Sequence, residues 1–150
     1  MKKTTYIKET VKHVVMVRLF VDKITALLKL QVSNHDLSKL KEPEYDYFKK
    51  YTPLLRDSVF GSKEYNDFLE ALKPALEHHY SVNRHHPQHH KNGIKDMNLV
   101  DLIEMICDWK ASSMRHKTGD IYKSLDINQK RFNYSDELKS IFKNTLDLLK

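Results

Sequence analysis

A long, unbroken helical pattern near the N-terminus is the feature that most restricts how this chain can fold. Over residues 5–31, apolar side chains recur every three or four positions, and no proline or glycine interrupts them. The pattern predicts a helix over residues 5–31, with an apolar face broad enough for a central position. The chain has only three glycines and four prolines in 150 residues, and 31% of its residues are charged, which favours helices over a β-sandwich.

Capping and helix-breaking residues divide the rest of the chain into further helices. Good helix-start residues precede helical patterns at Asn34, Pro43, Ser62, Asn98 and Ser135. Breaks are predicted at Pro53, Gly61 and Gly119, a kink at Pro74, and a polar connection or short helix over residues 120–134. The last helix is expected to bury Leu138, Ile141, Phe142, Leu146 and Leu149. We therefore expect an all-α fold of about five to seven helices, forming one domain over residues 1–150.

Composition narrows the class of protein. The single cysteine, Cys107, excludes an internal disulfide and indicates a reducing compartment. No apolar run reaches the length that a membrane span needs, and no signal-peptide core is present, so a cytoplasmic protein is expected. The net charge of +6 favours small anionic partners, but the lysines are scattered, so direct binding to nucleic acid is not expected.

The doublet His35-Asp36 offers an imidazole nitrogen and a carboxylate oxygen from adjacent residues. Such a pair suits a borderline or hard divalent metal ion, although two ligands do not complete a site. Further candidates are His13, the histidines between His78 and His90, and the acidic residues between Asp101 and Asp108. His13 is predicted to face inward on its helix, where its alternative role is that of a hydrogen-bonded core residue.

The densest group of histidines lies between Glu77 and His90, which contains six of the nine in the chain. Helical phase turns His79 inward and its neighbour His78 towards solvent. Pro87 and the Asn92-Gly93 pair that follows place the later histidines on a loop. For His89 and His90, the alternative is an exposed loop that chelates metal without any function.

Three carboxylates, those of Asp101, Glu104 and Asp108, share one face of the helix predicted after Asn98. They repel one another unless cations lie nearby, and a solvated face is the simpler interpretation. Asp101 can act only as a favourable charge at the helix start. Asp108 has apolar neighbours in the sequence and is the favoured inward ligand, with Asp101 as the alternative. The core stripe of this helix is predicted to contain Leu99, Leu102, Ile103 and Ile106.

An inward histidine, a His-Asp doublet about twenty residues later and a distant downstream aspartate together resemble the HD-domain superfamily of metal-dependent phosphohydrolases. The run from His35 to Lys39 is similar to its His-Asp-hydrophobe-Gly-Lys signature, with Ser38 in place of the glycine. The resemblance covers residues 7–116, and residues 117–150 are expected to form a C-terminal connection and packing helix. The segment from His79 to His90 also resembles a small group of bacterial and phage proteins with this fold.

The resemblance implies that His13, His35, Asp36 and Asp108 hold one divalent metal. In the branch of the superfamily that holds two metals, extra histidines lie between the doublet and the last aspartate. His79, with His85 or His86, occupies that interval and would complete a second site. The implied cofactor is therefore one or two ions of Mn, Mg, Co, Zn or Fe per chain.

Charged residues near these ligands are candidates for catalysis. Lys39 and Arg84 are predicted to contact phosphate, with Arg115 as a third candidate. Glu77 and Glu104 are predicted proton acceptors or partners that orient the histidines. For each of the five, the simpler interpretation is a surface ion pair.

The leading functional hypothesis is a phosphohydrolase that acts on a nucleotide or a related small phosphate ester. A divalent ion would lower the pKa of bound water and polarise a phosphoryl oxygen. The alternatives are a di-iron oxygenase with the HD fold and a non-catalytic binding protein that retains the fold. The sequence does not identify the substrate, and it is compatible with a homo-oligomer.

Overall fold

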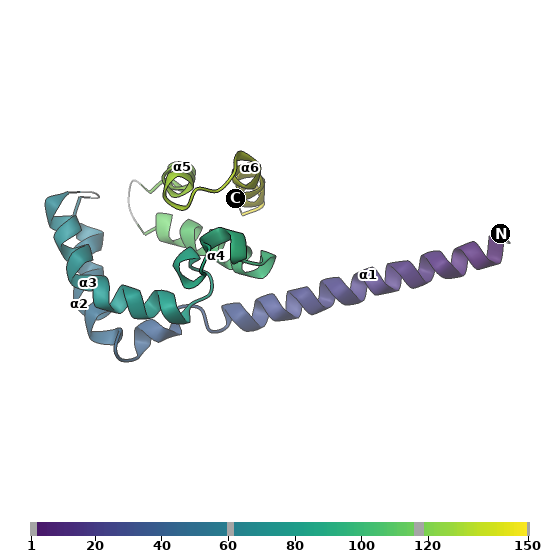
Figure 1. Cartoon of the computed structure of the whole chain (residues 1–150), viewed down its shortest axis with the longest axis horizontal. Helices are drawn as coiled ribbons and strands as arrows, with labels where there is room; N and C mark the ends of the chain where they lie inside the picture. Colours follow the sequence, from purple (N-terminus) through teal and green to yellow (C-terminus); the bar gives the residue numbers. More distant parts are fainter. Residues whose placement is uncertain (1–2, 60–61, 116–118, 150) are drawn as a thin grey trace. The chain divides into compact units, whose positions relative to one another are not determined.

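The computed structural model describes residues 3–59, 62–115 and 119–149, and every regular element in these ranges is helical. The α-helices are α1 (Lys3–Val32), α2 (Tyr45–Asp57), α3 (Lys63–Val82), α4 (Leu99–Ser113), α5 (Ile121–Phe132) and α6 (Asp136–Asp147). Short 3-10 helices are η1 (Leu37–Leu40), η2 (Pro87–His89) and η3 (Gly93–Asp96). The predicted all-α class and the predicted number of helices are confirmed for the described residues (Figure 1).

Contacts divide the chain after His35 into two units, which we describe separately. The first unit holds α1, which covers the predicted N-terminal helix. Most apolar side chains of α1 are exposed, including those of Val14, Phe20 and Ile24. Residues 3–35, the described part of this unit, contain no second helix, so the expected central position of this helix remains a prediction.

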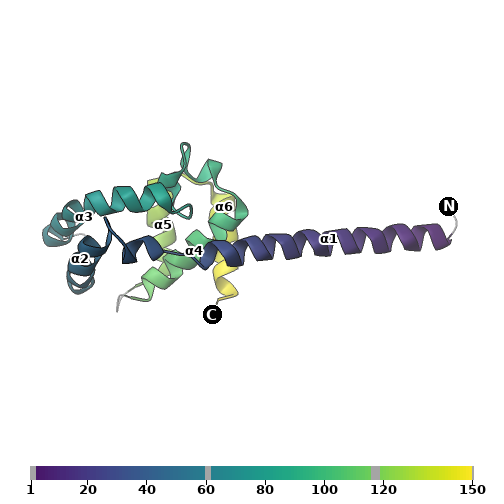
Figure 2. The same cartoon turned by 90° about the horizontal axis from the view of Figure 1, so that it is seen from below.

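In the second unit, α4, α5 and α6 pack together around an apolar core (Figure 2). Its buried members are Met97, Met105, Ile106, Ile121, Leu125, Tyr134, Phe142 and Leu146. The Trp109 ring packs against this core and stacks on Phe132, with ring centroids 6.0 Å apart. The Tyr134 hydroxyl donates a 2.7 Å hydrogen bond to the Leu125 carbonyl, and burial raises the pKa of Tyr134 to about 12. This core holds α4 in place, and α4 carries acidic residues on the other part of its buried surface.

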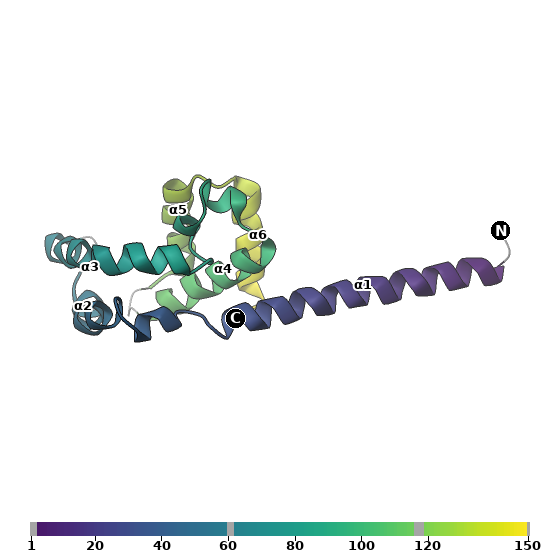
Figure 3. The same ribbon diagram turned by 60° about the horizontal axis from the view of Figure 1, so that its bottom comes forward.

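The remaining helices of this unit, α2 and α3, lie side by side (Figure 3). The 3-10 helix η1 contacts both of them, and η2 contacts α3. A bend is visible within α3, as expected for a helix that contains a proline, Pro74. The arrangement brings the segment that begins at Asp36 close to the C-terminal part of α3 and the histidine-rich loop that follows it.

Three of the predicted capping residues are confirmed, and the helix start predicted at Asn34 is wrong, because η1 begins at Leu37 with Asp36 as its N-cap residue. Ser62, Asn98 and Ser135 each cap a helix with their side chains, and Asn98 forms a capping box with Asp101. The break predicted at Pro53 is wrong, because α2 continues through this residue to Asp57. Proline removes a single backbone donor, and this helix tolerates that loss. The break predicted at Gly61 lies outside the described residues.

Two predicted core faces are wrong in part. In α4, Leu99 and Ile103 are exposed, and Asp101 and Glu104 are buried instead. The buried face of α4 therefore includes polar residues, which the periodicity of apolar residues in the sequence cannot predict. In α6, Phe142 and Leu146 are buried and Leu138 packs against the core as predicted, but Ile141 and Leu149 are exposed.

Candidate metal centre

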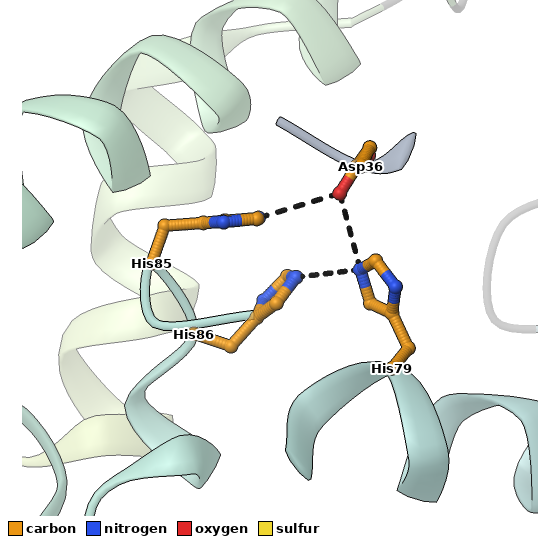
Figure 4. A group of neighbouring side chains, drawn as sticks. All are labelled: Asp36, His79, His85 and His86. Carbon is orange, nitrogen blue, oxygen red and sulfur yellow. Dashed lines mark hydrogen bonds and ion pairs between the residues drawn. The ribbon is translucent and has the colours of Figure 1, made fainter. Parts of the chain in front are cut away.

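Four side chains of the second unit point towards one another (Figure 4). They are Asp36, His79, His85 and His86, and each offers a ligand atom within 4.8 Å of those of the other three. His79 is 1% exposed and His85 is 2% exposed, so two of the histidines are fully enclosed by protein. All four were predicted as metal ligands from the sequence, and the fold brings them together from three separate segments.

The spacing of the ligand atoms fits a single ion. Two atoms that each lie about 2.1 Å from one metal ion are about 3.0 Å apart at a right angle and about 3.4 Å apart at the tetrahedral angle. His79 Nε2 lies 2.9 Å from His86 Nε2 and 3.2 Å from Asp36 Oδ1. His85 Nε2 lies 3.5 Å from the same Asp36 oxygen. These four residues therefore form a set of donors that could hold one divalent cation.

Asp36 reaches this position from a strained backbone. It has a φ of 58° and a ψ of 10°, in the left-handed region that few residues other than glycine adopt. Aspartate is among the residues that tolerate this region best. The turn immediately precedes η1, and its curvature places the carboxylate beside the histidines of the neighbouring helix and loop.

The three histidines come from the end of α3 and the loop that follows it. His79 lies in the last turn of α3, and Asn83 ends the helix, with both its backbone N–H and its side-chain amide donating to the His79 carbonyl. A tight turn follows, in which the His86 backbone N–H donates to the Asn83 carbonyl. His85 and His86 then approach the same centre, with their ring centroids 4.0 Å apart.

Behind His79 lies a buried carboxylate that sequence reasoning missed. Glu44 immediately precedes α2 and is 0% exposed. Its Oε2 lies 2.9 Å from His79 Nδ1, and its Oε1 lies 2.8 Å from Nδ1 of the neighbouring His78. The Ser38 hydroxyl also donates to Glu44 Oε2, at 3.0 Å. Ser38 therefore adds a hydrogen bond to the network behind His79.

His85 has a similar partner on α4. Glu104 is 4% exposed, and its Oε1 lies 3.3 Å from His85 Nδ1. The prediction that Glu104 could orient a histidine fits this geometry. A carboxylate behind a metal-binding imidazole fixes the ring orientation and raises its basicity as a ligand. Both fully buried histidines have this arrangement.

The tautomer of each buried histidine bears on metal binding. When His79 and His85 donate from Nδ1 to Glu44 and Glu104, their Nε2 atoms carry lone pairs that face Asp36 Oδ1. In this tautomer the two nitrogens and the carboxylate oxygen are directed to one point, which is the arrangement that binds a cation.

The third histidine, His86, is held in its neutral form. Burial, together with the nearby His85 and His79, lowers the pKa of His86 to about 3, and the carboxylates of Asp108 and Asp36 oppose this effect. A neutral imidazole is the form that binds a metal ion. His86 can therefore act as a ligand throughout the physiological range without losing a proton first.

Asp108, the predicted last ligand, lies beside this centre on α4. One of its carboxylate oxygens is within 4.8 Å of a carboxylate oxygen of Asp36, and Ser112 Oγ donates to Asp108 Oδ1 at 3.4 Å. The alternative, Asp101, has other partners. It is 0% exposed, completes the capping box of α4 and accepts two hydrogen bonds from Arg84, at 3.2 and 2.9 Å.

The predicted phosphate-contacting residues have different surroundings. Arg84 forms the bidentate pair with Asp101 that ties the histidine-rich loop to α4. Lys39 Nζ lies 2.6 Å from Asp36 Oδ2 and 5.0 Å from the centroid of the Phe48 ring, at the edge of the proposed metal centre. Arg115 is exposed and lines a pocket of about 890 Å³ between the end of α2 and the start of α5.

The other predicted site residues are placed less informatively. Glu77 is exposed on α3. His13 is exposed on α1, and His35 ends the same unit, directly before Asp36 in the chain. The ligand roles of both histidines remain predictions.

No described helix has the length and apolar character needed to cross a membrane.

Comparison with known proteins identifies a family but no activity. No curated protein and no solved structure matches the chain. A family model, described as a family of unknown function (DUF5662), matches residues 2–149, and the chain belongs to that family.

Proposed function

We propose that this protein is a metal-dependent phosphohydrolase that acts on a small phosphate ester, with a nucleotide as one candidate substrate. The observation that carries the metal part is the convergence of Asp36 Oδ1 with the Nε2 atoms of His79 and His85, both oriented by buried glutamates. The resemblance of the His35-to-Lys39 run to the HD signature supports the reaction class.

The number of ligands bears on which metal supports catalysis. A catalytic ion needs at least one position for water or substrate. Four protein ligands fill a tetrahedral zinc ion and would make it structural. An ion that prefers six ligands, such as Mn²⁺, Fe²⁺ or Co²⁺, would keep two positions open. We therefore expect activity with these ions and little with Zn²⁺.

A bound divalent ion would supply Lewis acidity, both for activating water and for polarising a phosphoryl oxygen. The protein's own side chains have complementary roles. Asp36, His79, His85 and His86 hold the ion, and the ammonium of Lys39 places positive charge next to it, where negative charge develops on phosphate.

The adjoining pocket gives the rest of the substrate a place to bind. Ser112 connects the two sites, since its hydroxyl contacts Asp108 and it also lines the pocket. Trp109 and Tyr65 supply apolar surface to the pocket, Arg115 and Lys123 supply positive charge, and Asp57 and Asp120 supply negative charge. Such a mixed lining suits an organic group that has both apolar and polar parts.

Phosphate release tests this proposal directly. Purified protein with Mn²⁺, Co²⁺ or Mg²⁺ is incubated with a panel of nucleotides, sugar phosphates and an artificial aryl phosphate. We expect metal-dependent release from at least one substrate, loss of release in His79→Ala, and no change in Glu77→Gln, since Glu77 is exposed.

The negative outcomes separate the alternatives. If metal binds tightly but no phosphate is released from any substrate, the phosphohydrolase assignment fails and the metal centre stands. Iron content with a visible oxo-bridged absorption band would then indicate a di-iron oxygenase. If the protein binds none of these ions, both the metal centre and the phosphohydrolase assignment are refuted. A non-catalytic binding role then remains.

A further inference from the structure

We infer that the metal centre holds a single divalent ion because the ammonium group of Lys39 occupies the position that a second ion would take. This inference rests on the proposed metal centre and concerns its stoichiometry. It assigns Lys39 a role in selecting a one-ion over a two-ion site. That distinction decides which metal chemistry the protein can perform.

The two oxygens of Asp36 have different partners. Oδ1 faces His79 Nε2 at 3.2 Å and His85 Nε2 at 3.5 Å, inside the four-ligand set. Oδ2 accepts a 2.6 Å charge-assisted hydrogen bond from Lys39 Nζ. A carboxylate that bridges two metal ions gives one oxygen to each, and here the second oxygen is bonded to an ammonium group.

Lys39 is held in this position by the local structure. It lies in η1, and Asp36 is the residue directly before this short helix, so the two side chains are only three positions apart. Its Nζ also lies over the Phe48 ring, 5.0 Å from the centroid, where the π-face attracts a cation. The side chain is 28% exposed, and that of Asp36 is 15% exposed, so bulk water screens the pair only partly.

A second divalent ion cannot share this oxygen with the ammonium group. In two-metal hydrolases the ions lie about 3.5–4 Å apart, each about 2.1 Å from a shared carboxylate. An ion bound to Asp36 Oδ2 would therefore lie within a few ångströms of Nζ, at a separation where like charges repel strongly. Either the lysine moves away or the second ion stays out.

The carboxylate that such a second ion would need is already close. Asp108 places an oxygen within 4.8 Å of an Asp36 oxygen, and its charge reaches His86. Lys39 thus supplies one positive charge beside Asp36, the carboxylate that Asp108 approaches. Replacing it with an uncharged side chain should open a position between Asp36 and Asp108 to a cation.

Counting ions per chain tests this inference. Protein stripped of metal is loaded with excess Mn²⁺, desalted and measured by elemental analysis, and the electron paramagnetic resonance spectrum is recorded. We expect one ion and an uncoupled Mn²⁺ spectrum for the wild type. For Lys39→Met we expect two ions and a spectrum with exchange coupling between neighbouring Mn²⁺ ions. The double variant Lys39→Met/Asp108→Asn should return to one.

Two controls separate the position of the charge from its mere presence. Lys39→Arg keeps a cation beside Asp36 and should stay at one ion. Lys41→Met removes an exposed charge two residues away and should also stay at one. Circular dichroism of each variant verifies folding. If Lys39→Met does not fold, two ions in the wild type would still overturn the inference.

The outcomes are distinct. Two ions in the wild type, or one ion in a folded Lys39→Met, would overturn the role assigned to Lys39 and leave the metal centre standing. If the wild type binds no ion, the proposed metal centre itself is refuted. A one-ion wild type that becomes a coupled two-ion site only in Lys39→Met would support the inference.

Discussion

Glu44→Gln is the substitution that tests most sharply how the metal centre is held. Glu44 is 0% exposed and divides its two oxygens between His78 Nδ1, at 2.8 Å, and His79 Nδ1, at 2.9 Å. Glutamine has nearly the same shape but offers one oxygen and one NH₂ group. One histidine therefore faces a donor in place of an acceptor.

We expect Glu44→Gln to reduce mainly the affinity for the metal ion. If His79 loses its acceptor, its proton can move to Nε2, and the lone pair directed at the metal is lost. Loss of a partner behind a metal-binding histidine typically costs about 10–100-fold in affinity. This corresponds to about 1.4–2.8 kcal/mol of binding free energy.

Stability without metal should change less. The variant loses hydrogen bonds to a charged group, which contribute about 1.5–3 kcal/mol each. It also no longer buries a carboxylate, whose desolvation opposes folding by several kcal/mol. We expect these two effects largely to offset each other, so the metal-free variant should remain folded.

Calorimetric titration with Mn²⁺ or Co²⁺ measures the affinity, and urea denaturation in the presence of a chelator measures the stability. Glu77→Gln is the matched control, because Glu77 lies on α3 near the same histidines but is exposed. A folded Glu44→Gln that binds metal as tightly as the wild type would refute the orienting role of this carboxylate. So would an equal loss of affinity in Glu77→Gln.

Three other predictions test the centre from different directions. Mn²⁺ at 100 times its dissociation constant should stabilise the protein by about 2.7 kcal/mol in thermal denaturation, and Asp36→Asn should reduce this shift severely. In the metal-free protein, the lowered pKa of His86, about 3, means that the folded state binds fewer protons than the unfolded state between about pH 3 and the usual value of 6.5. Stability should therefore fall as the pH drops through this range, and His86→Gln should flatten the dependence in urea titrations. Arg84→Ala should destabilise the protein by about 1–2 kcal/mol, because the substitution leaves the buried Asp101 without its bidentate partner. This magnitude is discounted for solvent screening, since the Arg84 side chain is 48% exposed. A loss of phosphate affinity without a loss of stability would point back to the phosphate-contacting role.

Local sequence patterns predicted the helices and their starts well, because capping chemistry involves residues close together in the chain. Ser62, Asn98 and Ser135 cap their helices through hydrogen bonds that reach only three residues ahead. The inward position of His79 follows from helical phase for the same reason. Such features need no knowledge of the tertiary structure.

The network behind the ligands could not be predicted, because its members meet only in three dimensions. Glu44 lies 35 residues before His79, and a glutamate at a helix start is usually a solvent-exposed charge. Helical periodicity also gave α4 an apolar face, whereas Asp101 and Glu104 are buried there because Arg84 and His85 compensate them. A buried charge becomes predictable only when its partner is known.

The histidine-rich segment shows why composition alone could not separate ligands from structural residues. Its histidines differ in what their ring nitrogens contact. Those of His79, His85 and His86 converge on Asp36. His89 Nδ1 lies 3.1 Å from the Tyr80 carbonyl and His90 Nε2 lies 2.9 Å from the Arg84 carbonyl, so both rings donate to backbone and close the loop. The exposed, chelating loop considered for these two histidines does not fit these contacts. Because the loop has to present two adjacent imidazoles to one point, the hydrogen bonds that fix its backbone are as necessary for the site as the ligands themselves.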